Sequence, residues 1–321
     1  MPAKVFITAK IPANGIILLR KKGYRVRVYS GNKPLSRPQL LREVKGVDAV
    51  LSLLTDHIDE ELLRVAGPEL RIVANYAVGY DNIDLQAARQ RRVHITNTPD
   101  VLNGSVAEHA IALMLALGHR LVEADSFTRA GKYHGWQPLL LLGTCLHDKT
   151  LGIIGLGRIG YEVARRMKDG FDMKLLYHDT HRNRKLEQEL GIQYVSLTAL
   201  LRQSDFISLH VPLLAATRHM IDAPQFLLMK KSAYIINTSR GPVIREKALL
   251  AALKKKIIAG AALDVFENEP HLTPGLAEMS NVILTPHIAS ATKEAREGMS
   301  ALAARNIIAV LSGKQPLTPV R

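Results

Sequence analysis

The sequence predicts an α/β protein with two doubly wound, Rossmann-like domains, each built on a parallel sheet. Short apolar strand patterns alternate with helical patterns along the chain, as βαβ units require. The alternation occurs in two successive series, and the second begins at Leu151. Aromatic residues make up only 5% of the chain, so the core is expected to be aliphatic. Strands that are covered by helices on both faces have this composition.

The predicted strands follow the apolar runs of each series. The first series comprises residues 4–10, 24–29, 48–54, 71–77 and 94–97, with helices at 60–66 and 85–91 among them. The second series comprises residues 151–154, 174–178, 206–210, 234–238, 259–265 and 282–284. A chain of 321 residues is long enough for two such domains, each with its own core.

Two long helices and one loop are predicted outside these strands. Apolar residues recur at helical spacing over 101–130, which predicts a single long helix. The stretch 131–148 lacks this periodicity, and we expect an exposed loop that contains the only tryptophan, Trp136. A final helix is predicted over 291–311, and its apolar positions require a partner surface.

The composition narrows the classes of function. The net charge is +14, but basic residues occur in small dispersed clusters without interleaved aromatics, so we expect a solvated surface and no nucleic-acid partner. A single cysteine, Cys145, excludes an intramolecular disulfide and favours a reducing compartment. No signal-peptide pattern and no apolar run of about 18 residues is seen, so we expect a cytoplasmic protein without a membrane partner. The histidines show no metal-ligand spacing, and no metal is predicted.

A Gly-x-Gly-x-x-Gly turn follows the first strand of the second series and precedes a helical pattern. Gly155 permits the tight turn, Gly157 lets the backbone approach a pyrophosphate, and Gly160 lets helix and strand pack closely. The N-terminus of the following helix favours the phosphate charge. We therefore expect a dinucleotide cofactor to contact this turn, including Arg158 and Ile159.

An acidic residue, Asp179, ends the next strand, nineteen residues beyond the last glycine of the turn. A carboxylate there can accept hydrogen bonds from the adenosine ribose hydroxyls. It should repel a ribose 2′-phosphate, which favours NAD over NADP. Four basic residues follow at once and either hold such a phosphate or face solvent, so NADP stays open: His181, Arg182, Arg184 and Lys185.

Further motifs are distributed over nearly the whole chain in a fixed order. They are Asn-Tyr-Ala-Val-Gly-Tyr-Asp-Asn-Ile-Asp at 75–84, Asn-Thr-Pro-Asp-Val-Leu at 97–102, Val-Ala-Glu at 106–108, the glycine turn, Asn-Thr-Ser-Arg-Gly at 237–241, Ala-Leu-Asp-Val-Phe-Glu-Asn-Glu-Pro at 262–270 and Thr-Pro-His at 285–287. Together they resemble the D-isomer-specific 2-hydroxyacid dehydrogenases and, within them, the glyoxylate/hydroxypyruvate reductases.

The resemblance implies an architecture. An NAD(P)-binding Rossmann domain would run over residues 100–285, and a substrate-binding domain would combine residues 1–99 with 286–321. The active site would be the cleft between these domains. In this family, homodimers form largely through the nucleotide-binding domain, and a tryptophan of the partner subunit can reach the active site. Trp136 would then be either such a residue or an interface anchor.

Three residues are expected to carry the chemistry on a 2-oxo acid. Arg240 follows an apolar strand, and its planar fork can bind a carboxylate. His287, in the Thr-Pro-His motif, can donate a proton to the carbonyl oxygen during reduction and accept one during oxidation. Glu269 would hydrogen-bond this imidazole and favour its protonated form.

The resemblance also implies the residues that line the rest of the site. Asp264 would hold the nicotinamide carboxamide, and Thr238 and Pro212 would line the cofactor channel. Val78 and Gly79 would offer backbone N–H groups to the substrate carboxylate, and Leu54 would lie near the substrate side chain. Core packing is the alternative for Val78 and Leu54.

The predicted function is reversible NAD(P)H-dependent reduction of a small 2-oxo acid to the D-2-hydroxy acid, with glyoxylate or hydroxypyruvate favoured. The resemblance leaves open a phosphite dehydrogenase or a D-lactate-type dehydrogenase. Phosphite dehydrogenases carry a lysine where Val78 stands, which disfavours that alternative. A catalytically weak NAD-sensing scaffold of the same fold is a further alternative, because such proteins can retain the catalytic residues.

Overall fold

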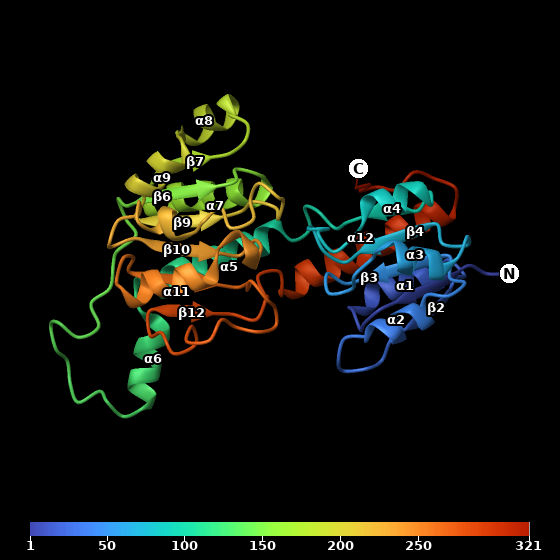
Figure 1. Cartoon of the computed structure of the whole chain (residues 1–321), viewed down its shortest axis with the longest axis horizontal. Helices are drawn as coiled ribbons and strands as arrows, with labels where there is room; N and C mark the ends of the chain where they lie inside the picture. The colour runs from blue at the N-terminus through green and yellow to red at the C-terminus, as the bar shows by residue number, and fades with distance from the viewer. Residues whose placement is uncertain (321) are drawn as a thin grey trace. The chain divides into compact units, whose positions relative to one another are not determined.

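The computed structural model describes residues 1–320, which form two compact units. The first unit comprises Met1–Leu102 together with the chain from Ala291 onward, and the second comprises Asn103–Ser290. Each unit is a parallel sheet with helices on both faces (Figure 1). The predicted fold class of two doubly wound α/β units is therefore confirmed.

The first unit has a five-stranded parallel sheet in the order β2-β1-β3-β4-β5. Its strands are β1 (Lys4–Ile7), β2 (Arg25–Val28), β3 (Ala49–Ser52), β4 (Ile72–Asn75) and β5 (His94–Thr96). The central strands β3 and β4 are buried on both faces, which explains their unbroken runs of apolar and small residues. The edge strand β2 alternates exposed arginines with half-buried valines.

Helices cover both faces of this first sheet. They are α1 (Ala13–Lys21), α2 (Arg37–Glu43), α3 (Glu60–Ala66), α4 (Leu85–Gln90) and the C-terminal α12 (Lys293–Leu311). Helices α2, α3 and α4 share one apolar cluster with the sheet. Helix α12 packs on α1 and on strands β3 and β4. The approach of α1 and α12 is close, because a Cβ on Gly15 would lie 2.3 Å from the carbonyl oxygen of Ser300.

The second unit has a seven-stranded parallel sheet in the order β12-β11-β10-β9-β6-β7-β8. Its strands are β6 (Thr150–Ile154), β7 (Lys174–His178), β8 (Gln193–Tyr194), β9 (Phe206–Leu209), β10 (Tyr234–Asn237), β11 (Gly260–Leu263) and β12 (Val282–Leu284). Strand order reverses between β6 and β9, which are hydrogen-bonded neighbours. In open parallel sheets, ligands bind at the carboxyl ends of the strands beside such a switch point.

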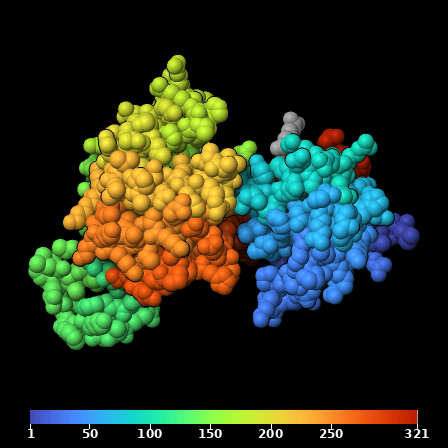
Figure 2. Space-filling view, viewed as in Figure 1, coloured from blue at the N-terminus to red at the C-terminus, as the bar shows by residue number. Residues whose placement is uncertain are grey.

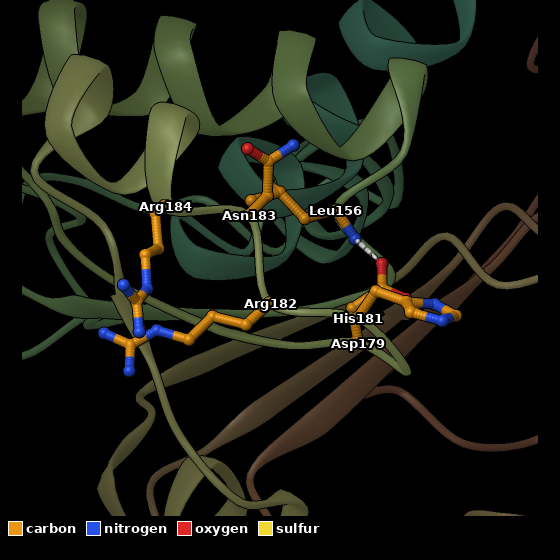
Figure 3. A pocket seen from close by; sticks show the side chains of 6 residues that line it. All are labelled: Leu156, Asp179, His181, Arg182, Asn183 and Arg184. Atoms are coloured by element: carbon orange, nitrogen blue, oxygen red, sulfur yellow. Dashed lines mark hydrogen bonds between the residues drawn. The ribbon is translucent and has the colours of Figure 1, made fainter.

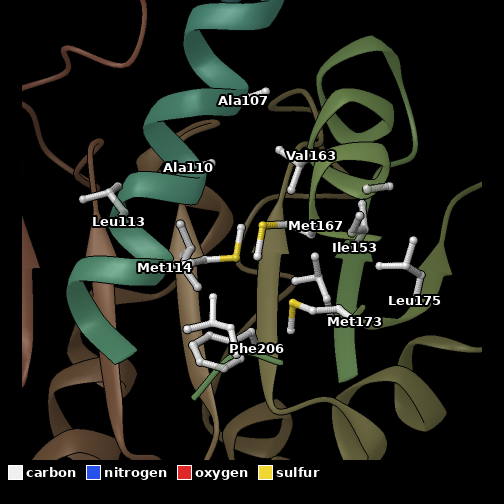
Figure 4. Packing of buried hydrophobic residues seen from close by; sticks show 14 of the residues in the cluster. Ala107, Ala110, Leu113, Met114, Ile153, Val163, Met167, Met173, Leu175 and Phe206 are labelled. Atoms are coloured by element: carbon white, nitrogen blue, oxygen red, sulfur yellow. The ribbon is translucent and has the colours of Figure 1, made fainter. Parts of the chain in front are cut away.

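Two apolar clusters cover the faces of the second sheet. On one face, α5 (Asn103–Gly118), α7 (Arg158–Phe171) and α8 (Arg184–Leu190) form the first cluster with the sheet. This cluster includes Met114 of α5, Met167 of α7 and Phe206 of β9 (Figure 4). On the other, α9 (Leu197–Gln203), α10 (Ala223–Phe226) and α11 (Glu246–Lys254) form the second cluster. A short 3-10 turn, η1, covers Gly241–Val243. The apolar face that the periodicity of each helix predicts is therefore buried against the sheet.

The single helix predicted over 101–130 is wrong, because the chain forms two helices with a sharp bend between them. Helix α5 ends at Gly118, and α6 (Leu121–Arg129) begins after Arg120, which adopts a left-handed conformation at φ 54°. The returning chain stabilises this break, since the N–H of Thr144 donates to the carbonyl of Gly118 over 2.8 Å. Apolar periodicity continues across the break, so the sequence pattern alone did not reveal it.

The segment after the bend is largely exposed, although Leu146 near its end is buried in the first apolar cluster. Helix α6 has no buried residue, and residues 131–148 form the predicted loop without helix or strand. Figure 2 shows this green segment as a protrusion from the second unit. Within residues 1–320, no single helix is both long and apolar enough to cross a membrane, although the bent pair α5–α6 meets those criteria jointly.

Several strands are shorter at their carboxyl ends than predicted. The predicted strands 4–10, 48–54, 71–77 and 259–265 end at Ile7, Ser52, Asn75 and Leu263. Most of the residues that follow are apolar, apart from Thr8, Lys10 and Asp264, but they leave the ladder and form loops at the carboxyl edge of each sheet. Apolar composition therefore extends beyond the hydrogen-bonded strand.

Candidate active site

The glycine turn lies at the switch point of the second sheet, between β6 and α7. Gly155 has φ +93°, a conformation that favours glycine. A Cβ on Gly160 would lie 2.2 Å from the carbonyl oxygen of Gly155, so the helix could not pack as closely with any other residue. A Cβ on Gly157 would meet open space, which leaves room for a ligand at the N-terminus of α7. Arg158 is exposed and Ile159 is half-buried in the first turn of that helix.

Asp179 lies directly beside this turn. Its carboxylate Oδ2 accepts a hydrogen bond from the N–H of Leu156 over 2.8 Å (Figure 3). Both residues line a pocket of about 530 Å³. A carboxylate at the edge of a pocket next to a glycine turn fits the ribose of a dinucleotide. The residues present therefore fit a nicotinamide dinucleotide at its adenosine end.

Three of the four basic residues after Asp179 line the same pocket, namely His181, Arg182 and Arg184. The Arg182 guanidinium binds the Glu187 carboxylate through three N–O contacts of 2.8–3.1 Å. This pairing holds the pKa of Glu187 below its usual value. The Tyr177 hydroxyl also donates to Glu187 over 2.8 Å, so the acceptor itself is fixed. Arg182 is thus held by an internal carboxylate, and the Arg184 guanidinium lies beside that of Arg182 at the same pocket (Figure 3).

Two further predicted cofactor residues follow strands β9 and β10. Thr238 is 8% exposed, and its hydroxyl has no hydrogen-bond partner within residues 1–320. A buried hydroxyl without a partner is costly unless a ligand supplies one. Pro212 is exposed in the loop after β9. The neighbouring His210 is neutral, because burial lowers the pKa of its imidazole to about 4.

The three predicted catalytic residues follow three neighbouring strands. Arg240 follows β10, Glu269 follows β11 and His287 follows β12. Parallel strands present their carboxyl ends at one edge of a sheet, and the glycine turn after β6 lies at that same edge. The fold therefore brings all three to the edge that carries the dinucleotide turn.

Arg240 lies on a tight turn that the buried Asn237 organises. The Asn237 Nδ2 donates to the carbonyl of Arg240 over 2.9 Å, and its Oδ1 accepts from the N–H and hydroxyl of Ser239. The next residue, Gly241, packs against the loop after β11, since a Cβ there would lie 1.8 Å from the carbonyl oxygen of Phe266. The half-buried Arg240 side chain also donates to the carbonyl of Ser239.

His287 and Glu269 form the hydrogen-bonded pair that the sequence predicts. The His287 Nδ1 lies 2.9 Å from the Glu269 Oε2, and the two side chains are 26% and 32% exposed. The other carboxylate oxygen of Glu269 accepts from the N–H of Phe266 over 3.1 Å, which fixes its orientation. Because Nδ1 bonds to Glu269, Nε2 is the ring nitrogen that takes no part in this pair.

Asp264 has a role that the sequence did not reveal. Its carboxylate is fully buried and accepts hydrogen bonds from the N–H groups of Ile288 and Ala289 and from the Thr285 hydroxyl. Burial alone would raise the pKa of Asp264, but these donors and His109 hold that pKa below its usual value. The carboxylate thus holds the chain on both sides of His287 through hydrogen bonds.

These hydrogen bonds to Asp264 matter because His287 has φ 54°, which is a strained conformation for a residue with a side chain. The N–H of His287 donates to the carbonyl of Asp264 over 2.8 Å. His109 supports the arrangement from α5, with its Nε2 3.2 Å from the Thr285 hydroxyl and 3.4 Å from the Asp264 carboxylate. Sequence reasoning missed His109, and only its place in the Val-Ala-Glu-His stretch could have drawn attention to it.

The predicted substrate residues of the first unit lie in loops at the carboxyl edge of its own sheet. Leu54 follows β3, and Val78 and Gly79 follow the adjacent β4. All three are half-buried. Asn82 ties the two loops together, since its Nδ2 donates to the carbonyl of Leu53.

The sheet order, the glycine turn and the acidic residue after β7 define the second unit as a doubly wound dinucleotide-binding unit with a histidine–glutamate pair at its ligand edge. A family model for the NAD binding domain of the D-isomer specific 2-hydroxyacid dehydrogenases matches residues 111–289. The chain belongs to this family, and the predicted family and cofactor class are confirmed.

Relatives match over the full length. A glyoxylate reductase of Thermococcus litoralis is 50% identical, covering 98% of this chain and 96% of its own. The TT0316 protein of Thermus thermophilus is 38% identical with a TM-score of 0.93, covering 99% of this chain and 100% of its own. A Sinorhizobium meliloti NADPH-dependent glyoxylate/hydroxypyruvate reductase, solved with NADP and malonate, is 32% identical with a TM-score of 0.86 and covers 100% and 97%.

Proposed function

We propose that this protein reduces a small 2-oxo acid, with glyoxylate or hydroxypyruvate as its substrate, to the D-2-hydroxy acid in a reversible reaction. The observation that carries the proposal is the His287–Glu269 pair, 2.9 Å apart, at the sheet edge that also holds the glycine turn and Arg240. Family membership and the glyoxylate reductases among the relatives support it.

Each catalytic residue has a distinct task in this proposal. Arg240 binds the substrate carboxylate through its planar fork and so orients the carbonyl group. A reduced nicotinamide bound at the glycine turn would supply the hydride for the carbonyl carbon. His287 donates its proton from Nε2 to the carbonyl oxygen as the C–O double bond becomes single. Glu269 accepts from Nδ1 and stabilises the protonated ring that makes this transfer.

The remaining predicted contacts are part of the same proposal. Asp264 would contact the nicotinamide carboxamide, although its carboxylate is already engaged with the chain around His287. Thr238 would receive a partner from the cofactor, and Pro212 would lie beside it. Leu54 would contact the substrate side chain. The substrate-binding domain would consist of residues 1–99 and 286–321, and the cofactor-binding domain of residues 100–285.

The test is consumption of NADH or NADPH with a panel of glyoxylate, hydroxypyruvate, pyruvate and phosphite. The proposal expects turnover with the first two to exceed turnover with the others. Preference for pyruvate would identify a D-lactate-type enzyme. Preference for phosphite would contradict the proposal, as the uncharged Val78 does not favour a doubly charged inorganic substrate. Cofactor binding with no turnover would identify a sensing scaffold.

NAD is the proposed cofactor, and replacing Asp179 with serine should shift preference toward NADPH. The Asp179 carboxylate disfavours a 2′-phosphate through like charge, and Arg182 is already paired with Glu187. We expect kcat/KM for NADH, divided by kcat/KM for NADPH, to fall about tenfold. This change corresponds to about 1.4 kcal/mol. A matched control is Asp169→Ser on α7. An unchanged ratio in Asp179→Ser would remove this residue from cofactor selection.

A homodimer is proposed from the exposed apolar segment of α6 and the following loop. Its large apolar side chains are between 51% and 81% exposed: Leu121, Val122, Tyr133, Trp136, Leu139 and Leu142. Apolar surface of this extent is typical of a subunit interface. A second copy of this chain is the proposed occupant, and Trp136 would anchor it or extend to the partner's site. A cytoplasmic location, which the single cysteine favours, remains a prediction from composition.

The solution mass tests this surface. Light scattering should give twice the 35.4 kDa of one chain, and Leu139→Glu should shift the protein to the single-chain mass. The control is Leu227→Glu, which alters a leucine of similar exposure, 70% against 79%, outside this segment. A single-chain mass for the unaltered protein, or equal behaviour of the two variants, would contradict the proposed interface.

A further inference from the structure

The loop after β4 has an unusual arrangement of its backbone carbonyls. Three successive carbonyl groups accept hydrogen bonds from neighbouring parts of the first unit. The carbonyl of Ala77 accepts from the N–H of Thr98 over 2.9 Å, and that of Val78 from the Asn97 Nδ2 over 2.8 Å. The carbonyl of Gly79 accepts from the Asn75 Nδ2 over 2.9 Å. Each of the three peptide planes is therefore anchored on its oxygen side.

Anchoring the oxygen fixes the direction of the N–H in the same peptide. The peptide group is planar, and in the trans form its N–H points opposite to its C=O. The peptides of this loop are trans. The N–H groups of Val78, Gly79 and Tyr80 therefore point away from Thr98, Asn97 and Asn75, respectively.

These three N–H groups have no acceptor of their own. Across residues 1–320, no oxygen accepts a hydrogen bond from the backbone N–H of Val78, Gly79 or Tyr80. Val78 and Gly79 are nevertheless half-buried. Backbone donors that lack a protein acceptor are rare in partly buried loops and require water or a ligand. In other folds, successive backbone N–H groups that lack a protein acceptor form anion-binding sites.

We propose that Asn97 is a positioning residue that turns the Val78–Gly79–Tyr80 backbone into a three-donor binding loop for a carboxylate. This inference rests on the proposed function in taking the 2-oxo acid as the bound anion, and it extends that function in two ways. It adds the N–H of Tyr80 as a donor, and it assigns the orientation of the loop to the Asn97 side chain through its hydrogen bond to the Val78 carbonyl.

Asn97 is the better residue to test, although Asn75 anchors the adjacent peptide. Asn75 is fully buried and also bonds with Ser52 and Asn82, so its replacement would disturb several loops at once. Among residues 1–320, the side chain of Asn97 bonds only to Val78, while its backbone holds Thr318 independently of the side chain. A change at Asn97 therefore isolates one anchor.

The experiment compares Asn97→Asp with the unaltered enzyme. Aspartate has nearly the same shape, but it offers an acceptor in place of the donor and would repel the Val78 carbonyl. We expect KM for glyoxylate and the inhibition constant of oxalate to rise about tenfold, with kcat within about twofold, because ground-state and transition-state binding are lost equally. The dissociation constant for NADH should stay unchanged.

The matched control is Asn281→Asp. The Asn281 Nδ2 also donates to a backbone carbonyl over 2.8 Å, that of Ala259, but it precedes β12 at the opposite edge of its sheet from the catalytic loops. Its KM and oxalate inhibition should match those of the unaltered enzyme. If Asn97→Asp lacks a cooperative melting transition, Asn97→Ala removes the donor without adding charge, and the same rise in KM is expected.

The outcomes separate this inference from the proposed function. If the unaltered protein turns over no 2-oxo acid, the proposed function fails, and oxalate binding to the NADH complex, followed by cofactor fluorescence, still tests the loop. Weaker oxalate binding in the Asn97 variants supports the positioning role in either case. Unchanged oxalate binding and unchanged KM would overturn it, and so would a loss confined to kcat.

Discussion

Replacing Arg240 with alanine is expected to lower kcat/KM for 2-oxo acids by about a thousandfold. The guanidinium is the cation that the proposal assigns to the substrate carboxylate, and removing one partner of a desolvated charge pair costs roughly 2–5 kcal/mol. A thousandfold loss corresponds to about 4 kcal/mol at 1.36 kcal/mol per decade. Initial rates with glyoxylate measure the effect, and the dissociation constant for NADH should be unchanged.

Two further variants test whether the geometry of the fork matters. Arg240→Lys keeps the charge but loses the two parallel donors, so we expect an intermediate loss of activity. Arg245→Ala removes a guanidinium five residues along the chain, one that pairs with Asp222 over 2.6 Å, and it should leave kcat/KM nearly unaltered. Undiminished turnover by Arg240→Ala would show that another group binds the substrate carboxylate.

Replacing His287 with asparagine is expected to lower kcat for reduction by about 10²–10⁴-fold, which is the usual contribution of a general acid. Asparagine retains a polar side chain near Glu269 but supplies no titratable proton. Single-turnover measurements of NADH oxidation would locate the loss in the chemical step. The control is His147→Asn, because His147 is also close to carboxylates, Asp148 and Asp172, but lies outside the site.

Glu269→Gln tests the same proton transfer through the hydrogen bond that holds the ring. The Glu269 Oε2 lies 2.9 Å from the His287 Nδ1, and glutamine lacks the negative charge of this acceptor. We expect kcat for reduction to fall, with KM for glyoxylate nearly unchanged, because the pair acts on the proton transfer and not on substrate binding. An unchanged kcat would show that His287 does not need this carboxylate.

The carboxyl ends of the predicted strands show where sequence patterns succeed and where they stop. Alternating apolar runs located all five strands of the first sheet, and the glycine turn was recognised from its spacing, which reflects the steric demands at Gly155 and Gly160. The strand β8 and the short helices α1, α2 and α8 to α11 were not predicted, since their apolar patterns are brief. The bend after Gly118 was missed because the chain that stabilises it, at Thr144, is distant in sequence.

The sequence by itself determined the fold class, the family and the identity of the candidate catalytic residues, because local periodicity and short motifs encode them. Only the tertiary structure decided how those residues are held. Asp264 grips the chain around His287, and Asn97 anchors the Val78 peptide, through hydrogen bonds that join residues 19 to 25 positions apart. Such bonds form where folding brings buried donors and acceptors together, and no local sequence pattern records that pairing.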